Sequence, residues 1–182
     1  MESHHIDGFG RVRKEGPDKI TLTIKKFKLI NGRKMAEEFE VIVNNFKNAS
    51  DILSASGFTK QQFQEKYREK WSLPDPNVNE IVIDTYPGLK SYIEIECKTE
   101  ESMLQTCSTL GFDPKDSLSG HTDHVYAHVY GVNGSIFHGQ GATFGFHNTN
   151  EMIRPHVTSN IELFDQVVKE QAGMQGTFGI AK

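Results

Sequence analysis

The sequence has few cysteines, a single tryptophan and no long apolar run. Its 182 residues include 2 Cys and 1 Trp. Cys97 and Cys107 form no CxxC pair, and no secretory signal precedes them, so we expect reduced thiols in a cytoplasmic protein. No apolar run approaches the roughly 18 residues that a membrane span needs. These absences argue against a disulfide scaffold and against a membrane-spanning protein.

An excess of cationic residues is also absent. Asp and Glu number 24 against 20 for Lys and Arg, which gives a net charge of −4. A general nucleic-acid-binding protein usually has an excess of Lys and Arg, so we expect no sequence-specific nucleic-acid partner. Hydrophobic residues make up 36% and charged residues 24% of the chain, a polar composition that still folds. A chain of this length can form one domain with a core of its own.

Alternating hydrophobicity predicts antiparallel strands in the first part of the chain. Residues 9–14 are expected to form a short strand, and residues 20–27 alternate clearly between apolar and polar side chains. Asn31 and Gly32 form the dipeptide most typical of a tight hairpin turn. We therefore expect a strand over residues 35–43 that pairs antiparallel with residues 20–27.

Further strands are predicted in the middle of the chain, where one segment stays ambiguous. Residues 59–73 fit a helix, because Thr59 and Gln62 have the spacing of a capping box, but their second half also fits a strand. Residues 80–85 and 92–97 are predicted to be strands. The ambiguous segment needs information beyond its own periodicity.

Helices are expected at four places. Ser50 is expected to start a short helix that Gly57 ends. An apolar stripe with 3.6-residue spacing predicts a second helix over residues 99–110. A third is predicted over residues 123–130 and a fourth over residues 159–171. The last third of the chain is therefore mostly helices and loops.

Two carboxylates lie on one face of the strand predicted over residues 92–97. Glu94 and Glu96 alternate with Ile93 and Ile95, and side chains alternate across an extended backbone. Other predicted strands also place charged residues, mostly cationic, on one face. With the two carboxylates, the charged face comprises Arg11, Arg13, Lys25, Glu38, Glu40, Lys66, Arg68, Asp84, Glu94 and Glu96.

The charged face has two interpretations, and the patterning alone leaves both open. Antiparallel sheets often have one solvated face on which mixed charges form cross-strand pairs. Alternatively, the sheet curls into a barrel whose polar interior binds a ligand. Lys and Arg would then bind phosphate oxygens, and the acids would hold Mg²⁺ or Mn²⁺, which prefer carboxylate oxygen.

Five short blocks in one order resemble a known family. They are Gly10-Arg11-Val12-Arg13, Ile20-Thr21-Leu22-Thr23-Ile24-Lys25, Lys66-Tyr67-Arg68-Glu69-Lys70-Trp71, Ile83-Asp84 followed by Tyr86-Pro87-Gly88-Leu89, and Tyr92-Ile93-Glu94-Ile95-Glu96. This order resembles the CYTH family, the triphosphate tunnel metalloenzymes, which include class IV adenylate cyclases, thiamine triphosphatases and inorganic tripolyphosphatases. The resemblance covers residues 9–112. The family's opening Glu-x-Glu-x-Lys strand has no counterpart, since residues 1–9 offer only Glu2.

The resemblance implies a fold. We expect an α+β protein built on a closed antiparallel β-barrel, the triphosphate tunnel, with flanking helices. Residues 1–182 would form a single CYTH-like domain. Residues 113–182 would be a helical and loop C-terminal extension that packs on the barrel. The resemblance also favours a strand over residues 66–71 of the ambiguous segment.

The resemblance also implies which residues form the site. The triphosphate ligands would be Arg11, Arg13, Lys25, Lys66 and Arg68, of which Lys25, Lys66 and Arg68 would also act in catalysis. Glu94 and Glu96 would be metal ligands, with Asp84 and one of Glu38 or Glu40 assisting. The cofactor would be Mg²⁺ or Mn²⁺.

The implied function is that of an enzyme acting on a triphosphate. It would hydrolyse a nucleoside triphosphate or tripolyphosphate, or cyclise ATP to cAMP. The alternative is a non-catalytic binder of phosphorylated or nucleotide ligands that has lost the first catalytic strand. Either way the expected partner is a small-molecule triphosphate or nucleotide, without a membrane, and a homodimer is compatible with both.

Overall fold

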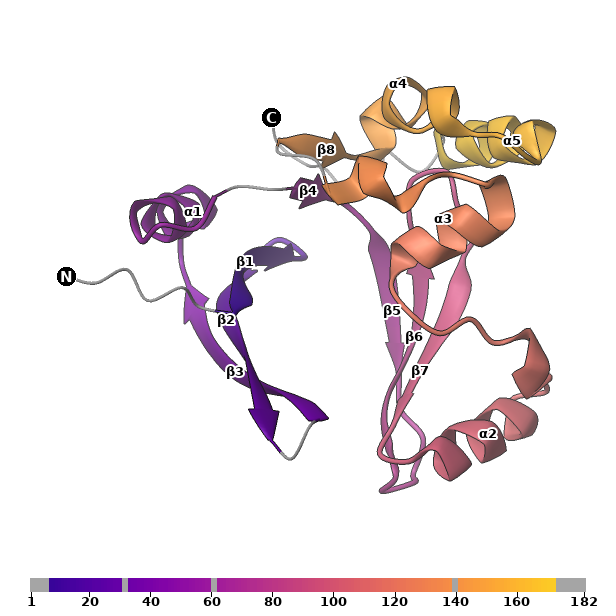
Figure 1. Ribbon diagram of the computed structural model, residues 1–182, viewed down its shortest axis with the longest axis horizontal. Helices are drawn as coiled ribbons and strands as arrows, with labels where there is room; N and C mark the ends of the chain where they lie inside the picture. The colour runs from indigo at the N-terminus through magenta and orange to yellow at the C-terminus, as the bar shows by residue number, and fades with distance from the viewer. Residues whose placement is uncertain (1–6, 31–32, 60–61, 139–140, 173–182) are drawn as a thin grey trace. The chain divides into compact units, whose positions relative to one another are not determined.

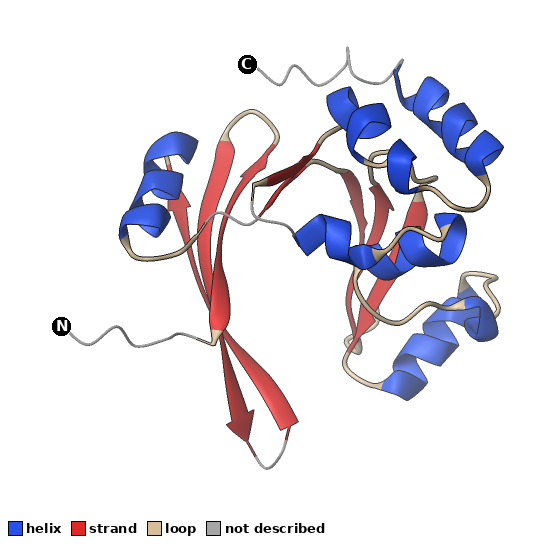
Figure 2. Cartoon of the chain, turned by 45° about the horizontal axis from the view of Figure 1, so that its top comes forward, coloured by secondary structure: helices blue, strands red, loops and turns tan. Residues whose placement is uncertain are grey.

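The computed structural model describes residues 7–30, 33–59, 62–138 and 141–172 (Figure 1). The chain divides into two compact units, Met1–Lys60 and Gln61–Lys182, and each is described by itself. Both contain strands and helices, which confirms the predicted α+β class (Figure 2). That residues 1–182 form one domain stays a prediction.

The first unit is a three-stranded antiparallel sheet with one helix. Its elements are β1 (Gly8–Glu15), β2 (Lys19–Ile30), β3 (Arg33–Val43) and α1 (Phe46–Ala55). The strand order is β1-β2-β3, and β2 pairs with β3 up to Ile30 opposite Arg33. This register confirms the predicted antiparallel hairpin, whose turn dipeptide lies outside the described residues.

One helix of the first unit begins earlier than predicted. Ser50 was expected to start it, but α1 begins at Phe46. The reason is Asn45, whose side-chain oxygen accepts a hydrogen bond of 2.8 Å from the backbone N–H of Asn48 and so caps the first turn. The predicted end is confirmed, since Gly57 follows the helix at φ 92°.

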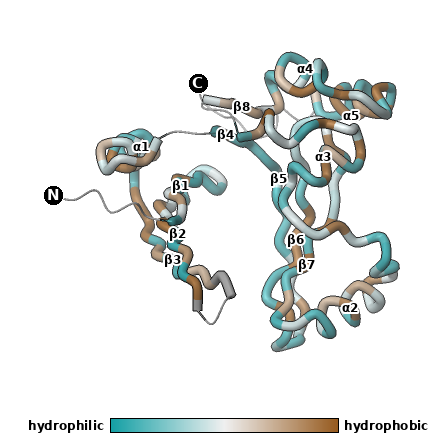
Figure 3. The backbone as a smooth tube through the Cα atoms, in the orientation of Figure 1, coloured by the Kyte–Doolittle hydropathy of each residue, from teal (hydrophilic) through white to brown (hydrophobic). Residues whose placement is uncertain are grey.

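Alternation along the strands gives the sheet of the first unit two different faces. Figure 3 shows hydrophobic and hydrophilic stretches alternating along β2 and β3. Register places Arg11 beside Thr23 and Thr23 beside Glu40, on the charged face. On the opposite face α1 packs against β1, where Leu53 lies next to Gly10. The charged face is thus the face away from α1.

The second unit contains the other five strands. They are β4 (Gln62–Gln64), β5 (Tyr67–Trp71), β6 (Val78–Thr85), β7 (Tyr92–Cys97) and β8 (Ala142–Phe144). Strands β5, β6 and β7 form an antiparallel sheet, and β4 pairs in parallel with β8. The ambiguous segment is therefore extended, as the resemblance favoured. Closure of the strands into a barrel stays a prediction.

Helices make up most of the rest of the second unit. They are α2 (Glu100–Thr109), α3 (Thr122–Tyr130), α4 (Thr149–Met152) and α5 (Ile161–Ala172), with single 3₁₀ turns at Pro114–Asp116, Gly134–His138, Phe146–Asn148 and Arg154–His156. The predicted α2, α3 and α5 are confirmed. In Figure 1, α3, α4 and α5 lie at the end of the sheet where β6 stops and β7 starts, and α2 lies beside the opposite end.

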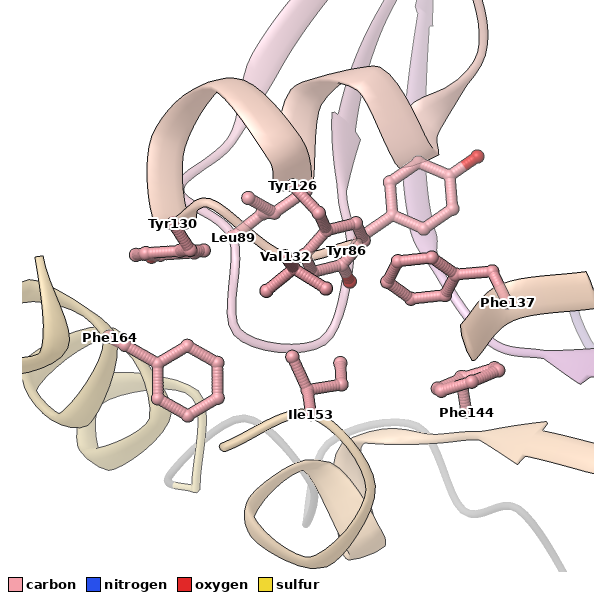
Figure 4. Close-up of a cluster of buried hydrophobic side chains, with 9 residues drawn as sticks. All are labelled: Tyr86, Leu89, Tyr126, Tyr130, Val132, Phe137, Phe144, Ile153 and Phe164. Carbon is pink, nitrogen blue, oxygen red and sulfur yellow. The ribbon is translucent and has the colours of Figure 1, made fainter. Parts of the chain in front are cut away.

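The core of the second unit surrounds the loop between β6 and β7. Figure 4 shows side chains from this loop, α3, β8 and α5 meeting there. The buried cluster comprises Tyr86, Leu89, Tyr126, Tyr130, Val132, Phe137, Phe144, Ile153 and Phe164. Most of these residues lie after residue 112, beyond the predicted family resemblance. The C-terminal third therefore builds the core that holds this loop.

Adding a methyl group at Gly88 should destabilise the second unit. Gly88 has φ 77°, and a Cβ there would lie 2.6 Å from Cε2 of the buried Phe164. We expect Gly88→Ala to lower the free energy of unfolding by about 2 kcal/mol, combining backbone strain with overpacking. Gly111→Ala is the matched control, since Gly111 has φ 83° and open space around it. Equal losses in chemical denaturation would contradict the packing contribution.

Candidate functional site

Asp84 is the centre of the ion-pair cluster in the second unit. It lies near the end of β6, where register places it between Arg68 on β5 and Tyr92 on β7. Residues directly opposite in an antiparallel sheet share a face, so these three side chains project together. Asp84 is fully buried, with 0% of the residue exposed. A buried carboxylate needs close partners to stay ionised.

Two cations give Asp84 those partners. Arg68 approaches it as a fork, with Nε 2.6 Å from Oδ1 and Nη2 2.5 Å from Oδ2. The Nζ of Lys66 donates to Oδ2 at 2.8 Å. Planar guanidinium and carboxylate groups match in this geometry, which makes the pair stronger than a single contact. Both cations predicted from the third sequence block therefore meet at one buried acid.

The ion pairs shift the pKa values of both partners toward the charged forms. Burial alone would raise the pKa of Asp84, but the hydrogen bonds from Arg68 and Lys66 outweigh it and the pKa falls below its ordinary value. The hydrogen bond to Asp84 in turn raises the pKa of Arg68 despite its partial burial. Asp84 and Arg68 are therefore both charged at neutral pH.

Acid should remove the contribution of Asp84 to stability. Because its pKa is lowered on folding, its contribution is complete above the pKa of the unfolded chain and disappears as pH falls through the lower folded value. We expect the stability difference between wild type and Asp84→Asn to shrink as pH falls from about 7 to about 2, measured by chemical denaturation. Asp165→Asn, at an exposed pair with Arg154, should show a smaller change. A stability difference between wild type and Asp84→Asn that does not vary with pH would contradict this expectation.

The two carboxylates of β7 project from the same face as Asp84. The side chain of Glu94 is 57% exposed, and its Oε2 accepts a hydrogen bond of 2.8 Å from Nη2 of Arg68. Glu96 is exposed and lies opposite Glu80 in the register. Among the residues that the structure describes, Glu96 forms no ion pair. Its oxygens are therefore accessible to a ligand.

Two tyrosines flank the cluster. The Nζ of Lys66 lies 5.2 Å from the ring centroid of Tyr86, a cation–π contact. The rings of Tyr86 and Tyr92 are stacked, with centroids 6.0 Å apart. Burial raises the pKa of Tyr92, which keeps its phenol neutral. The side chain of Lys66 is thus held between a carboxylate and an aromatic face.

The first unit presents a second group of cations, which are more loosely paired. Arg11 lies 3.6 Å from Glu38, and Lys25 lies 3.7 Å from the other oxygen of Glu38. Arg13 pairs with Glu15 at 3.3 Å. All three cations are about one third exposed. Pairs of this kind contribute little to stability, so these cations can change partners at low cost.

Arg11 has an unsatisfied donor. Its Nε is buried and has no hydrogen-bond partner among the described residues. Burial, followed by repulsion from Arg13, lowers the pKa of Arg11. A buried guanidinium N–H without a partner is unfavourable, and an anionic oxygen would relieve both the desolvation and the repulsion. This arrangement fits a phosphate ligand.

The predicted metal ligands fall in both units. Glu38 and Glu40 lie on β3, where Glu40 accepts a hydrogen bond of 2.8 Å from the hydroxyl of Thr23. Within the described ranges, no three His, Cys, Asp or Glu side chains cluster closely enough to hold a metal. Glu94 and Glu96 fit a hard divalent cation, because they are exposed carboxylates two residues apart on one strand face. Asp84 fits less well, since Arg68 and Lys66 engage both of its oxygens.

The structure adds one acid that the sequence prediction omitted. Glu80 lies on β6, with Oε2 3.5 Å from Nη1 of Arg68 and Oε1 3.1 Å from Nζ of Lys70. It precedes Asp84 by four residues, so strand alternation places both on one face. This spacing was available from the sequence and would have identified Glu80.

Comparison with known proteins identifies the family of the chain. The CYTH domain matches residues 8–106, more than half of the chain and all of the predicted blocks. The chain belongs to the CYTH family. This is a family of triphosphate-binding, metal-dependent proteins with a tunnel fold. Neither a curated protein nor a solved structure matches the chain. Among the described residues, no helix is both long and apolar enough to span a membrane.

Proposed function

We propose that the chain binds a nucleoside triphosphate or tripolyphosphate together with Mg²⁺ or Mn²⁺ and acts on it as an enzyme. The reaction would be hydrolysis, or cyclisation of ATP to cAMP. The proposal includes the predicted antiparallel barrel that encloses the triphosphate. It rests on one observation above all: Glu94 and Glu96 project, exposed, from the strand face that also holds Arg68 and Asp84.

The cations would divide the work between binding and charge neutralisation. Arg11, Arg13 and Lys25 are partly exposed and loosely paired, so they can bind phosphate oxygens by exchanging their present partners. Lys66 is held on Asp84 and beside Tyr86, which fixes its ammonium group before a ligand arrives. A fixed cation loses little entropy on binding and stabilises charge that develops during phosphoryl transfer.

Arg68 would act mainly on the carboxylates. Its guanidinium contacts Asp84, Glu80 and Glu94, so it offsets the repulsion among three acids. Glu94 and Glu96 would hold the metal, with Asp84 and one of Glu38 or Glu40 assisting. When bound, the divalent ion supplies charge neutralisation to the phosphate oxygens. Arg68 would hold Asp84 and Glu94 in place for that role.

Turnover of defined triphosphates tests the proposal. Pure protein is incubated with ATP and with tripolyphosphate, each with Mg²⁺ or Mn²⁺ and each with a chelator. We expect metal-dependent release of phosphate or pyrophosphate, or formation of cyclic nucleotide. No product, with a melting temperature that still rises with triphosphate, would leave a non-catalytic binder. No product and no thermal shift would overturn both binding and catalysis.

A further inference from the structure

A tight turn joins the two strands that contain Asp84 and Glu94. Tyr86, Pro87, Gly88 and Leu89 form it, and the N–H of Leu89 donates to the carbonyl of Tyr86 at 3.0 Å. Pro at the second position and Gly at the third, here with φ 77°, are typical of a type II turn. The turn is buried, although most turns lie at the surface. Its backbone polar groups therefore need protein partners.

One buried amide provides three of those partners. The side chain of Gln171 on α5 is in a residue only 5% exposed. Its Oε1 accepts from the N–H of Gly88 at 2.7 Å. Its Nε2 donates to the carbonyls of Tyr86 at 3.0 Å and of Leu89 at 2.8 Å. An apolar side chain of the same size would fill this space but would not form these hydrogen bonds. The contribution of the amide is therefore its directed hydrogen bonds.

Helix α3 completes the contacts with the turn. The hydroxyl of Tyr126 donates to the carbonyl of Pro87 at 2.6 Å, and that of Tyr130 donates to the carbonyl of Gly88 at 2.7 Å. Together with Gln171, these groups satisfy all four carbonyls of the turn. Figure 4 shows Tyr126, Tyr130 and Leu89 side by side above Ile153 and Phe164. Hydrogen bonds from α3 and α5 therefore hold the turn in place within the second unit.

The turn in its place determines the surroundings of Lys66. The ring of Tyr86, only 7% exposed, lies under the ammonium group of Lys66. The other partner of that group, Asp84, precedes Tyr86 by two residues. A shift of the turn would move the ring of Tyr86, whereas Asp84 is held in β6 by the strand pairing and by Arg68. The position of one predicted phosphate-binding cation thus depends on a helix far away in sequence.

We propose that Gln171 is a positioning residue for the triphosphate site. From α5 it fixes the turn, and through the ring of Tyr86 it fixes the ammonium group of Lys66 on Asp84. This inference rests on the proposed function for its consequence in binding, but the geometry it describes exists without a ligand. It gives residues beyond the CYTH match, which ends at residue 106, a role in the site.

The ligand-free test uses the reactivity of Lys66. Gln171→Met keeps the length of the side chain and removes its hydrogen bonds, and Gln166→Met is the matched control on the exposed face of α5. Reductive methylation of each lysine is followed by mass spectrometry. We expect Lys66 to react several-fold faster in Gln171→Met than in wild type or Gln166→Met, because the ring of Tyr86 no longer has a fixed position beside its ammonium group. Unchanged Lys66 reactivity would overturn the inference whether or not triphosphate binds.

The second test measures coupling to binding. We expect Gln171→Met to weaken tripolyphosphate binding with Mg²⁺ by about tenfold, the scale of one charge-assisted hydrogen bond. In a Lys66→Ala background the same change should alter the dissociation constant less than about twofold, because the two residues act through one contact. Equal losses in both backgrounds would mean a general structural effect and would overturn the positioning role.

Two further outcomes are distinguishable. If Gln171→Met does not fold, Tyr130→Phe takes its place, since it removes only the hydroxyl that binds the carbonyl of Gly88. It should again speed the modification of Lys66. If wild-type protein binds no triphosphate while Lys66 reactivity still rises in Gln171→Met, the proposed function fails and the positioning of Lys66 stands.

Discussion

Replacement of Arg68 by methionine should lower the free energy of unfolding by about 3 to 5 kcal/mol, the cost of leaving a buried charge without its partner. Asp84 is fully buried and takes two of its hydrogen bonds from Arg68. Methionine fills a similar length but donates nothing, so only Lys66 would remain on the carboxylate. Chemical denaturation measures the loss.

Two further variants separate the buried charge from general effects. Lys70→Met changes a more exposed cation on the same strand, whose pair with Glu80 should contribute less than about 1 kcal/mol. Adding Asp84→Asn to Arg68→Met should recover part of the lost stability, since the buried carboxylate that has lost its guanidinium partner is then neutral. If Arg68→Met costs no more than Lys70→Met, the cluster is not what stabilises this end of the sheet.

Removal of both carboxylates of β7 should abolish metal-dependent turnover and leave the fold intact. We expect Glu94→Ala with Glu96→Ala to lower the rate by about 100-fold or more, because a bound metal contributes several kcal/mol to transition-state stabilisation. The melting temperature should change little, since both side chains are exposed and bury no apolar surface. Activity and melting temperature are measured with and without Mg²⁺ or Mn²⁺.

The matched control lies on the same sheet. Glu69 on β5 is exposed, and register places it beside Ile83, on the face opposite Asp84. Glu69→Ala removes a carboxylate of equal charge and should preserve the metal dependence. A second readout is the rise in melting temperature with metal, which the double variant should lose. Activity that survives in the double variant would remove Glu94 and Glu96 from the metal site.

The strands were predictable because their signals are local. Alternation and the Asn-Gly dipeptide were enough to predict the pairing of β2 with β3. The segment over residues 59–73 was not predictable from periodicity, because Phe63 and Tyr67 fit a helix as well as the sheet. The pairing of β5 with the next strand, β6, decides it. Strand β8, with three residues paired in parallel to β4, is too short for any periodic signal.

The candidate site was predictable in its residue types and less so in its pairings. Motif order identified Lys66, Arg68 and Asp84, but the sequence could not reveal that the two cations meet on this carboxylate. Its assignment of Asp84 to the metal stays a prediction, and the structure adds that Arg68 and Lys66 engage both oxygens of this carboxylate. Gln171 was beyond prediction altogether, because its partners lie 82 to 85 residues earlier in the chain. Contacts at such separations leave no periodic trace.

The contact of Gln171 with the turn also has a consequence for the order of folding. The N–H of Gly88 in this turn gains its partner only from a residue 83 positions later. Contacts of high sequence separation form slowly, because a long loop must close before they stabilise anything. During synthesis, β6 and β7 emerge well before α5, so the N–H of Gly88 and the carbonyl of Leu89 wait for Gln171. We expect the second unit to become protease-resistant only after α5 has left the ribosome.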